Sequence, residues 1–168
     1  MLSVAISLSS PSIARDEQFS CKVEVIEQGK NVPATIARAK RGNEISIIYW
    51  VSEYFSKSGD TPKQRCKDTS QKFQKYYDNG WLKYIRTDIV NNVGVICVAH
   101  SKGDKCNKTD TIVTLPPSVN RFEALRNLLD LRRIASSGPL YLSDQLISYQ
   151  NGELYIDVDV FLKKLFTP

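Results

Sequence analysis

The chain has 168 residues, of which 42% are hydrophobic and 24% charged, and its formal net charge is +5. This length is enough for one buried core, and a chain that is 10% aromatic with only eight glycines and seven prolines is neither disordered nor of low complexity. The basic excess is compatible with an acidic protein or an anionic membrane surface as partner, although such an excess also serves solubility alone.

The N-terminal segment is uncharged from residue 2 to residue 14, and it contains only apolar or small side chains and one proline. Ser12 and Ala14 form the small-x-small pattern that signal peptidase cleaves. We therefore expect residues 1–14 to be the remnant of a signal peptide and residues 15–168 to form a single exported domain. An ordinary flexible tail is the alternative.

Three strands are predicted first along the chain. Apolar and polar residues alternate from Phe19 to Glu27, which is the period of a strand with one buried face. Residues 33–40 alternate less regularly, and residues 44–51 form a run of β-branched and aromatic side chains that includes Trp50. These segments predict a three-stranded antiparallel meander in which Trp50 belongs to the core or to its edge.

A helix with strong end signals follows the meander. Thr61 is a candidate N-cap, Pro62 suits the first helical position, and 79–80 is an Asn-Gly pair that stops the helix. Cys66 and Phe73 lie seven residues apart on its narrow apolar face. We expect this face to turn toward the sheet.

The second half of the chain repeats strands and then a helix. Residues 81–90, 93–99 and 109–115 read as strands, and residues 118–120 offer caps for a helix that ends near 136–139.

A further strand from Glu153 to Val158 and a short amphipathic helical close through Phe161, Leu162 and Leu165 are expected in the tail. The fold class is thus α+β, with a mainly antiparallel sheet of about six strands, two main helices packed on it, and disulfides.

Four cysteines in a chain with a signal-like segment indicate disulfides, and four cysteines allow three pairings. Cys97 and Cys106 flank a turn-rich loop, so that a bridge between them is geometrically easy. Cys21 would then pair with Cys66 across a much longer loop.

The residues around the cysteines carry a family resemblance. The motifs are Phe19-x-Cys21, Thr61-Pro62-x-x-Arg65-Cys66, Ile96-Cys97 and Gly103-x-x-Cys106. Together with the segments between them, roughly from residue 19 to 133, they resemble the cyanobacterial circadian-oscillating-protein family. The resemblance implies exported proteins that are peripheral to a membrane and whose expression oscillates daily. It implies no activity and no catalytic residues.

Candidate chemistry is sparse in this sequence. His100 is the single histidine, which excludes an H-E-x-x-H zinc site and leaves a catalytic triad dependent on one loop residue. Asp157 and Asp159 would share one face of a strand, where paired carboxylates can act as acid and base. No second apolar wall is evident to raise the pKa of one of them, so a solvated face is the favoured explanation. We expect no catalytic residue, no metal, no cofactor and no glycine-rich phosphate loop.

Two sets of residues are candidates for binding. The first is basic and belongs to the two helices, where it would contact a protein partner or lipid: Arg65, Lys72, Lys75, Arg132 and Arg133. The second is aromatic and would line a ligand cleft: Tyr49, Trp50, Tyr54 and Phe55. A solvated helix face is the alternative for the first set.

These observations rank three functions. The first hypothesis is a non-enzymatic exported interaction module, located in the periplasm or the thylakoid lumen and peripheral to a membrane, with an unknown protein or an anionic membrane surface as partner and no nucleic acid. The second is a small-ligand-binding or sensory domain with an aromatic-lined cleft. An unrecognised hydrolase is third.

Overall fold

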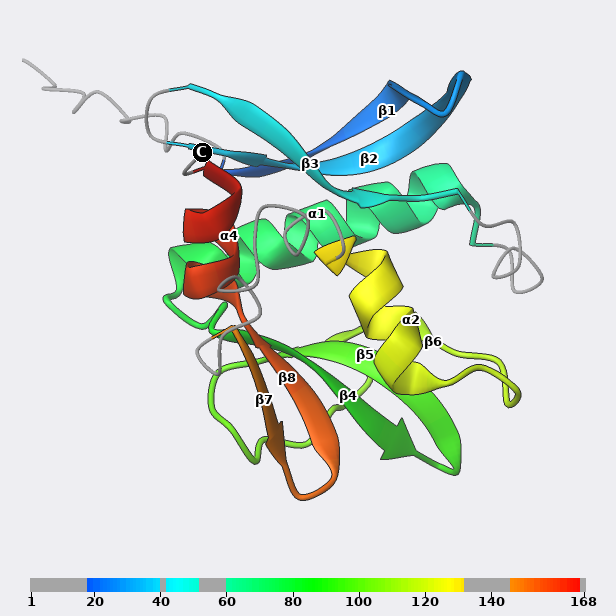
Figure 1. Cartoon of the computed structure of the whole chain (residues 1–168), viewed down its shortest axis with the longest axis vertical. Helices are drawn as coiled ribbons and strands as arrows, with labels where there is room; N and C mark the ends of the chain where they lie inside the picture. The colour runs from blue at the N-terminus through cyan, green and yellow to red at the C-terminus, as the bar shows by residue number, and fades with distance from the viewer. Residues whose placement is uncertain (1–17, 40–41, 52–59, 132–145, 167–168) are drawn as a thin grey trace, which may run out of the picture.

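The computed structural model describes residues 18–39, 42–51, 60–131 and 146–166. Within these residues the chain forms eight strands and three helices, which confirms the α+β class. Figure 1 shows a long helix, α1, lying between a small sheet on one side and a larger sheet on the other.

The first sheet is an antiparallel meander in the order β1-β2-β3, as the sequence predicts. Its strands are β1 (Phe19–Glu27), β2 (Lys30–Arg38) and β3 (Glu44–Tyr49). Gln28 and Gly29 both have positive φ, at 48° and 74°, which gives the tight two-residue turn that matches the twist of the flanking strands. Because this turn is so short, β2 begins three residues earlier than the alternation alone suggests.

Helix α1 (Pro62–Asp78) covers one face of this meander. Its N-terminus is capped as predicted, since the Thr61 hydroxyl accepts a hydrogen bond from the Gln64 N–H at 3.1 Å. Phe73 meets Phe19 edge to face, with ring centroids 5.6 Å apart. The apolar face of α1 is therefore turned toward the sheet, where it buries Phe73 and Cys66.

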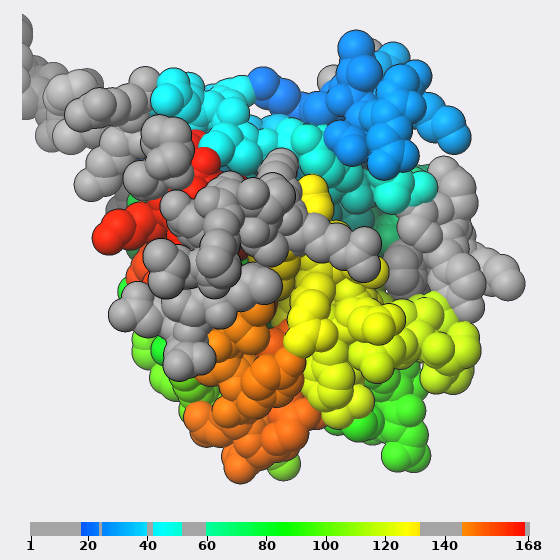
Figure 2. Space-filling model, in the orientation of Figure 1, coloured from blue at the N-terminus to red at the C-terminus, as the bar shows by residue number. Residues whose placement is uncertain are grey.

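The second sheet has five strands in the order β6-β5-β4-β8-β7. The strands are β4 (Tyr84–Val90), β5 (Val93–Ala99), β6 (Thr111–Thr114), β7 (Ile147–Gln150) and β8 (Glu153–Asp157). All four neighbouring pairs are antiparallel. Helix α2 (Arg121–Leu128) contacts β4 and β5, and helix α4 (Val158–Phe166) contacts β8. Figure 2 shows α2 and the β7–β8 hairpin side by side on one face, where Phe122 and Tyr149 are in edge contact.

The expectation of one sheet of about six strands with two helices is wrong in its detail. The strands divide between two sheets. The short helical close expected through Phe161, Leu162 and Leu165 is confirmed as α4. The predicted strand to residue 158 stops at Asp157, because the Asp157 carboxylate accepts the Val160 N–H at 2.9 Å and so caps α4. The second helix ends at Leu128 rather than near residue 136, and Asp130 follows in the left-handed region with φ 47°.

The two sheets share one core. A single cluster of buried side chains contains Phe19 and Trp50 from the first sheet and its end, Phe73 from α1, and Ile85 and Ile156 from the second sheet. No described helix is long and apolar enough to cross a membrane.

Candidate docking groove between helix α1 and the edge strand β6

Both predicted disulfides form, and together they use all four cysteines. Cys21 of β1 is bonded to Cys66 of α1, and Cys97 of β5 is bonded to Cys106 in the following loop. The first bond therefore attaches α1 to the small sheet. The second attaches the loop of residues 100–110 to the larger sheet.

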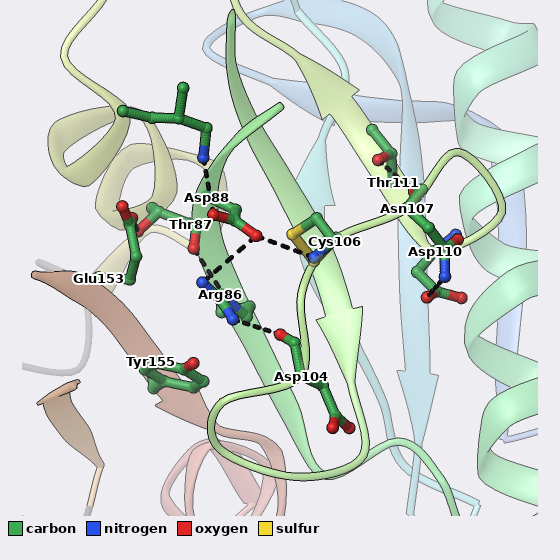
Figure 3. Close-up of a disulfide and its surroundings, with 12 residues drawn as sticks. Arg86, Thr87, Asp88, Asp104, Cys106, Asn107, Asp110, Thr111, Glu153 and Tyr155 are labelled. Atoms are coloured by element: carbon green, nitrogen blue, oxygen red, sulfur yellow. Dashed lines mark hydrogen bonds and ion pairs between the residues drawn. A yellow bond between two sulfur atoms is a disulfide. The ribbon is translucent and has the colours of Figure 1, made fainter. Parts of the chain in front are cut away.

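The loop of the second disulfide is held by a buried arginine (Figure 3). The side chain of Arg86 is only 5% exposed, and it donates from Nε to the Thr87 carbonyl at 2.8 Å and from a terminal nitrogen to the Asp104 carbonyl. Its guanidinium lies 4.8 Å from the centre of the Tyr155 ring. Arg86 thus connects β4, β8 and the loop.

Two further side chains, Asp88 and Tyr155, bond to the backbone of this loop. The Asp88 carboxylate accepts the Cys106 N–H at 2.9 Å and lies 3.5 Å from the Arg86 guanidinium. The Tyr155 hydroxyl accepts the Gly103 N–H at 3.0 Å. Because each of these groups bonds to loop backbone, this buried polar network stabilises the loop, and its charged members are already paired.

A groove of about 930 Å³ lies between α1 and β6. Residues of α1 and of the segment before it line one side, β6 and the prolines after it line another, and valines of the β4–β5 hairpin extend it. The charged residues that line it are Asp60, Arg65, Asp68, Lys72 and Lys108. The groove therefore has mixed charge on an apolar background.

Two of the predicted basic residues meet in this groove. Arg65 was expected on an exposed helix face, but it is only 8% exposed, because its guanidinium lies 5.4 Å from the centre of the buried Trp50 ring. Lys72 is partly buried and donates from Nζ to the Thr111 carbonyl of β6. Burial lowers the pKa of Lys72 from its ordinary value, while Asp110 and Asp68 act in the opposite direction.

The other predicted basic residues are not part of this groove. Lys75 is exposed and lines a separate hollow with Cys21 and Gln74, on the side of α1 that faces β1. Arg132 and Arg133 lie outside the described residues. The sequence-based basic surface is thus divided, with Arg65 and Lys72 on the groove side.

The free edge of β6 faces away from its only paired neighbour in the described sheet, β5. The Leu115 N–H donates to the Gly94 carbonyl at 2.8 Å, and the next pair along the ladder is Val95 with Thr114. Hydrogen-bonded and non-hydrogen-bonded pairs alternate in an antiparallel ladder, so the Thr114 N–H and C=O point away from β5. Thr114 lines the groove and is exposed.

A comparison with protein families gives a match over most of the chain. The family model described as circadian oscillating protein COP23 matches residues 18–163. The chain belongs to this family. Searches among curated proteins and among solved structures give no match. The COP23 match starts before Cys21 and ends beyond Cys106, so it includes both disulfides and the groove.

The described residues of this COP23 family member do not form the predicted aromatic cleft around Trp50. Trp50 is 3% exposed and donates from Nε1 to the Thr35 hydroxyl at 3.0 Å, which makes it a core residue. Tyr49 is half-buried, and Tyr54 and Phe55 lie outside the described residues.

A small hollow of about 270 Å³ forms instead around the other tryptophan. Trp81 is 53% exposed and stacks on His100, with ring centroids 5.5 Å apart. Tyr76 lines the same hollow and donates its hydroxyl proton to Asp110; burial, followed by this hydrogen bond, raises the pKa of Tyr76 to about 12. The sequence offers one signal for this hollow, which is a tryptophan directly after a helix-stopping glycine.

The candidate catalytic residues have separate roles. Asp157 caps α4, Asp159 lies 3.7 Å from Lys83 in an exposed ion pair, and His100 stacks on Trp81. The expectation that both carboxylates share a strand face is wrong, because Asp159 belongs to a helix. Among the described residues, no group of three or more side chains is placed to hold a metal ion.

Proposed function

We propose that this COP23 family member is an exported, non-enzymatic interaction module that is peripheral to a membrane through a protein partner. The observation that carries the proposal is the groove between α1 and β6, with its free strand edge and its charged walls. A groove of this kind offers both backbone hydrogen bonds and charged contacts to another protein.

The two disulfides support the proposed location in an oxidising compartment. Both are fully formed and all four cysteines take part, which is typical of proteins in an oxidising environment such as the periplasm. The family resemblance adds the thylakoid lumen as a second candidate. Export itself is part of the proposal.

The use of the buried charges favours binding over catalysis. Arg86 and Asp88 hold the disulfide loop, and the Glu153 carboxylate receives two hydrogen bonds of 3.0 Å from Arg121. Arg86, Asp88 and Glu153 are each paired with a structural group, so these three charges support the fold rather than a reaction.

Binding to membranes with charge-reversed variants tests this proposal. Lys108 and Lys75 are both exposed, but only Lys108 lines the groove. We expect the full chain to sediment with membranes of its source, protease treatment of those membranes to abolish sedimentation, and Lys108→Glu to weaken it. Lys75→Glu is the matched control, because it makes the same change of charge elsewhere.

Three results would contradict the proposal. Equal weakening by both variants would mean non-specific attraction between charges, which high salt would also remove. Equal binding to protein-free anionic liposomes would identify lipid as the partner. Absence of sedimentation from native membranes would remove the membrane location.

The small-ligand alternative has one observation in its favour, the 270 Å³ hollow beside the exposed Trp81. Its polar residues Asp104, Lys105 and Asn107 offer hydrogen bonds beside an aromatic ring, as many ligand sites do. A small-molecule extract of the same compartment that protects Trp81 from acrylamide quenching in wild type would favour this alternative. The buried Trp50 that remains in Trp81→Phe is the control. The hydrolase alternative has no described contact to support it.

A further inference from the structure

We infer that the occupant of the groove is an extended polypeptide segment that adds to the free edge of β6 as a further strand and places an acidic residue beside Lys72 and Lys108. This inference rests on the proposed docking function and specifies the chemistry of the partner. Three features of the groove carry it: the direction of the backbone groups, the covering of the edge, and the position of the charges.

The backbone of β6 presents hydrogen-bonding groups to the groove. The Thr114 N–H and C=O point away from β5, as the pairing of Val95 with Thr114 and the bond from Leu115 to Gly94 require. A strand that pairs here would lie about 4.8 Å from β6. An extended peptide can satisfy both groups with its own backbone, so recognition of this edge does not depend on a particular side chain at that point.

Lys72 covers the first carbonyl of the same edge. Its ammonium donates to the Thr111 carbonyl across the groove from α1. Edge strands are commonly protected by lysine, proline or a covering segment, and β6 itself contains neither lysine nor proline. The protection therefore comes from a flexible side chain of another element, which can turn aside when a peptide pairs with β6.

The charges at the Thr111 end of the groove favour a peptide with an acidic residue there. Lys72 and Lys108 both line the groove, and Lys108 lies three residues before Thr111. Burial lowers the pKa of the half-buried Lys72, although Asp110 and Asp68 act in the opposite direction. A further carboxylate placed beside Lys72 would offset more of the cost of the buried ammonium.

The remaining lining limits how acidic the peptide is. Asp60 and Asp68 also line the groove, so a uniformly acidic peptide would be repelled. Val93, Val95 and Ile112 provide the apolar contacts. The occupant is therefore an extended segment with apolar side chains and a carboxylate at the end that lies beside Lys72.

The test uses a display library of random twelve-residue peptides selected on the full chain, followed by affinity measurements with single peptides. Thr114→Pro removes the N–H that points into the groove without removing a bond to β5, and proline is tolerated at such edge positions. We expect this variant to lose roughly tenfold or more in peptide affinity, as one backbone hydrogen bond of about 1.4 kcal/mol predicts. Thr114→Ala keeps the N–H, so its affinity stays close to wild type.

Hydrogen exchange of the Thr114 amide gives a second readout that needs no proline variant. The amide is unprotected by β5 in the free protein, and a bound strand would slow its exchange. A selected peptide that leaves this exchange rate unchanged, or that binds Thr114→Pro as tightly as wild type, overturns strand addition.

The remaining outcomes separate the inference from the proposed function. Enriched peptides without Asp, Glu or a C-terminal carboxylate at one end, or peptides that bind Lys108→Glu as tightly as wild type, overturn the acidic selection. A library without any binder, beside membrane binding that Lys108→Glu weakens and Lys75→Glu does not, overturns the inference and leaves the docking function. Membrane binding that Lys108→Glu leaves unchanged overturns the docking function itself.

Discussion

Arg86 shows how a buried charge can serve structure at the level of a single residue. Its guanidinium contacts two backbone carbonyls, the Asp88 carboxylate and the Tyr155 ring, and every one of these groups is itself held in place. The residue before it and the residue after it, Ile85 and Thr87, are buried as well. A charge in the middle of a central strand is therefore compatible with this fold because a loop folds over it.

Replacement of Arg86 by methionine should be costly. Methionine keeps much of the aliphatic stem, but it leaves the Asp88 carboxylate without its ion pair and the Asp104 carbonyl without its donor. We expect Arg86→Met to lower the free energy of unfolding by about 3 kcal/mol in urea titrations.

The control for this prediction is Arg126→Met, since Arg126 donates to the Tyr149 hydroxyl in an exposed position. Its expected cost is below about 0.5 kcal/mol. Similar costs for the two variants would show that the buried network adds little to stability.

The raised pKa of Tyr76 makes the stability of the fold depend on pH in the alkaline range. Its pKa is about 12 in the folded chain against 10.0 for an unperturbed tyrosine, because burial and the hydrogen bond to Asp110 favour the protonated phenol. The stabilisation is complete below pH 10, where both states are protonated, and it is lost as the pH rises from 10 toward 12, since the unfolded chain releases its proton first.

A difference titration of phenolate absorbance between wild type and Tyr76→Phe measures this pKa among eight tyrosines. We expect the missing group to titrate near pH 12. Between pH 10 and 11 the variant should lose less stability than wild type does. A difference curve centred on pH 10 would contradict both expectations.

At the scale of elements, the two disulfides constrain loops of very different length. The sequence separation is 45 residues for Cys21 and Cys66 and 9 residues for Cys97 and Cys106. Loop-closure entropy predicts that replacement of both cysteines by alanine costs about 4 kcal/mol for the first pair and about 2.5 kcal/mol for the second. Urea midpoints of the two double variants measure the difference.

The loop that the second pair closes is also held by side chains of the larger sheet. Because Arg86, Asp88 and Tyr155 bond to the loop backbone, the loop should stay folded after its disulfide is removed. Protection of the Gly103 and Cys106 positions in the alanine variant would show this by hydrogen exchange. Loss of that protection, or a larger cost for the second pair than for the first, would contradict the prediction.

Sequence patterns predicted the elements better than their assembly. Alternation located β1, and the end signals at Thr61 and Asn79 located α1. The strands predicted at 81–90 and 93–99 leave two residues for a turn, Asn91 and Asn92, and both have positive φ values, 51° and 61°. Alternation states that one face of a strand is buried, but not which sheet the strand joins, so the division into two sheets was not accessible. The short β7 was missed for the same reason, because its pairing with β8 defines it.

The sequence predicts one wall of the groove but not the other. Arg65 and Lys72 are seven residues apart, which is nearly two helical turns, so they lie at almost the same angle around α1, whereas Lys75 is displaced by about 60°. Helical geometry thus explains why the first two share a groove. It does not reveal that β6 forms the opposite wall, since that depends on the strand order of the second sheet.

At the scale of the whole molecule, the shared core predicts one cooperative unit. Phe19 and Trp50 on one side and Ile85 and Ile156 on the other belong to the same buried cluster, so neither sheet can lose its partner without exposing core side chains. We expect one unfolding transition for residues 15–168, in agreement with the single-domain prediction.

Trp81→Phe makes this measurable, because it leaves the buried Trp50 as the only tryptophan and thus as a reporter of the first sheet. Its fluorescence, far-UV circular dichroism and the exchange of β4 and β8 amides should give the same midpoint in urea. Separate midpoints would mean that the two sheets unfold as independent units.

The spacing of the cysteines also has a consequence for oxidative folding. The 9-residue loop between Cys97 and Cys106 closes at a smaller entropic cost than any loop that involves Cys21 or Cys66, so this bond should form first in a reduced chain. Once it exists, Cys21 and Cys66 can pair only with each other. The order of oxidation therefore removes both incorrect isomers, and a reduced chain in an oxidising compartment would reach its native pairing with little need for a disulfide isomerase.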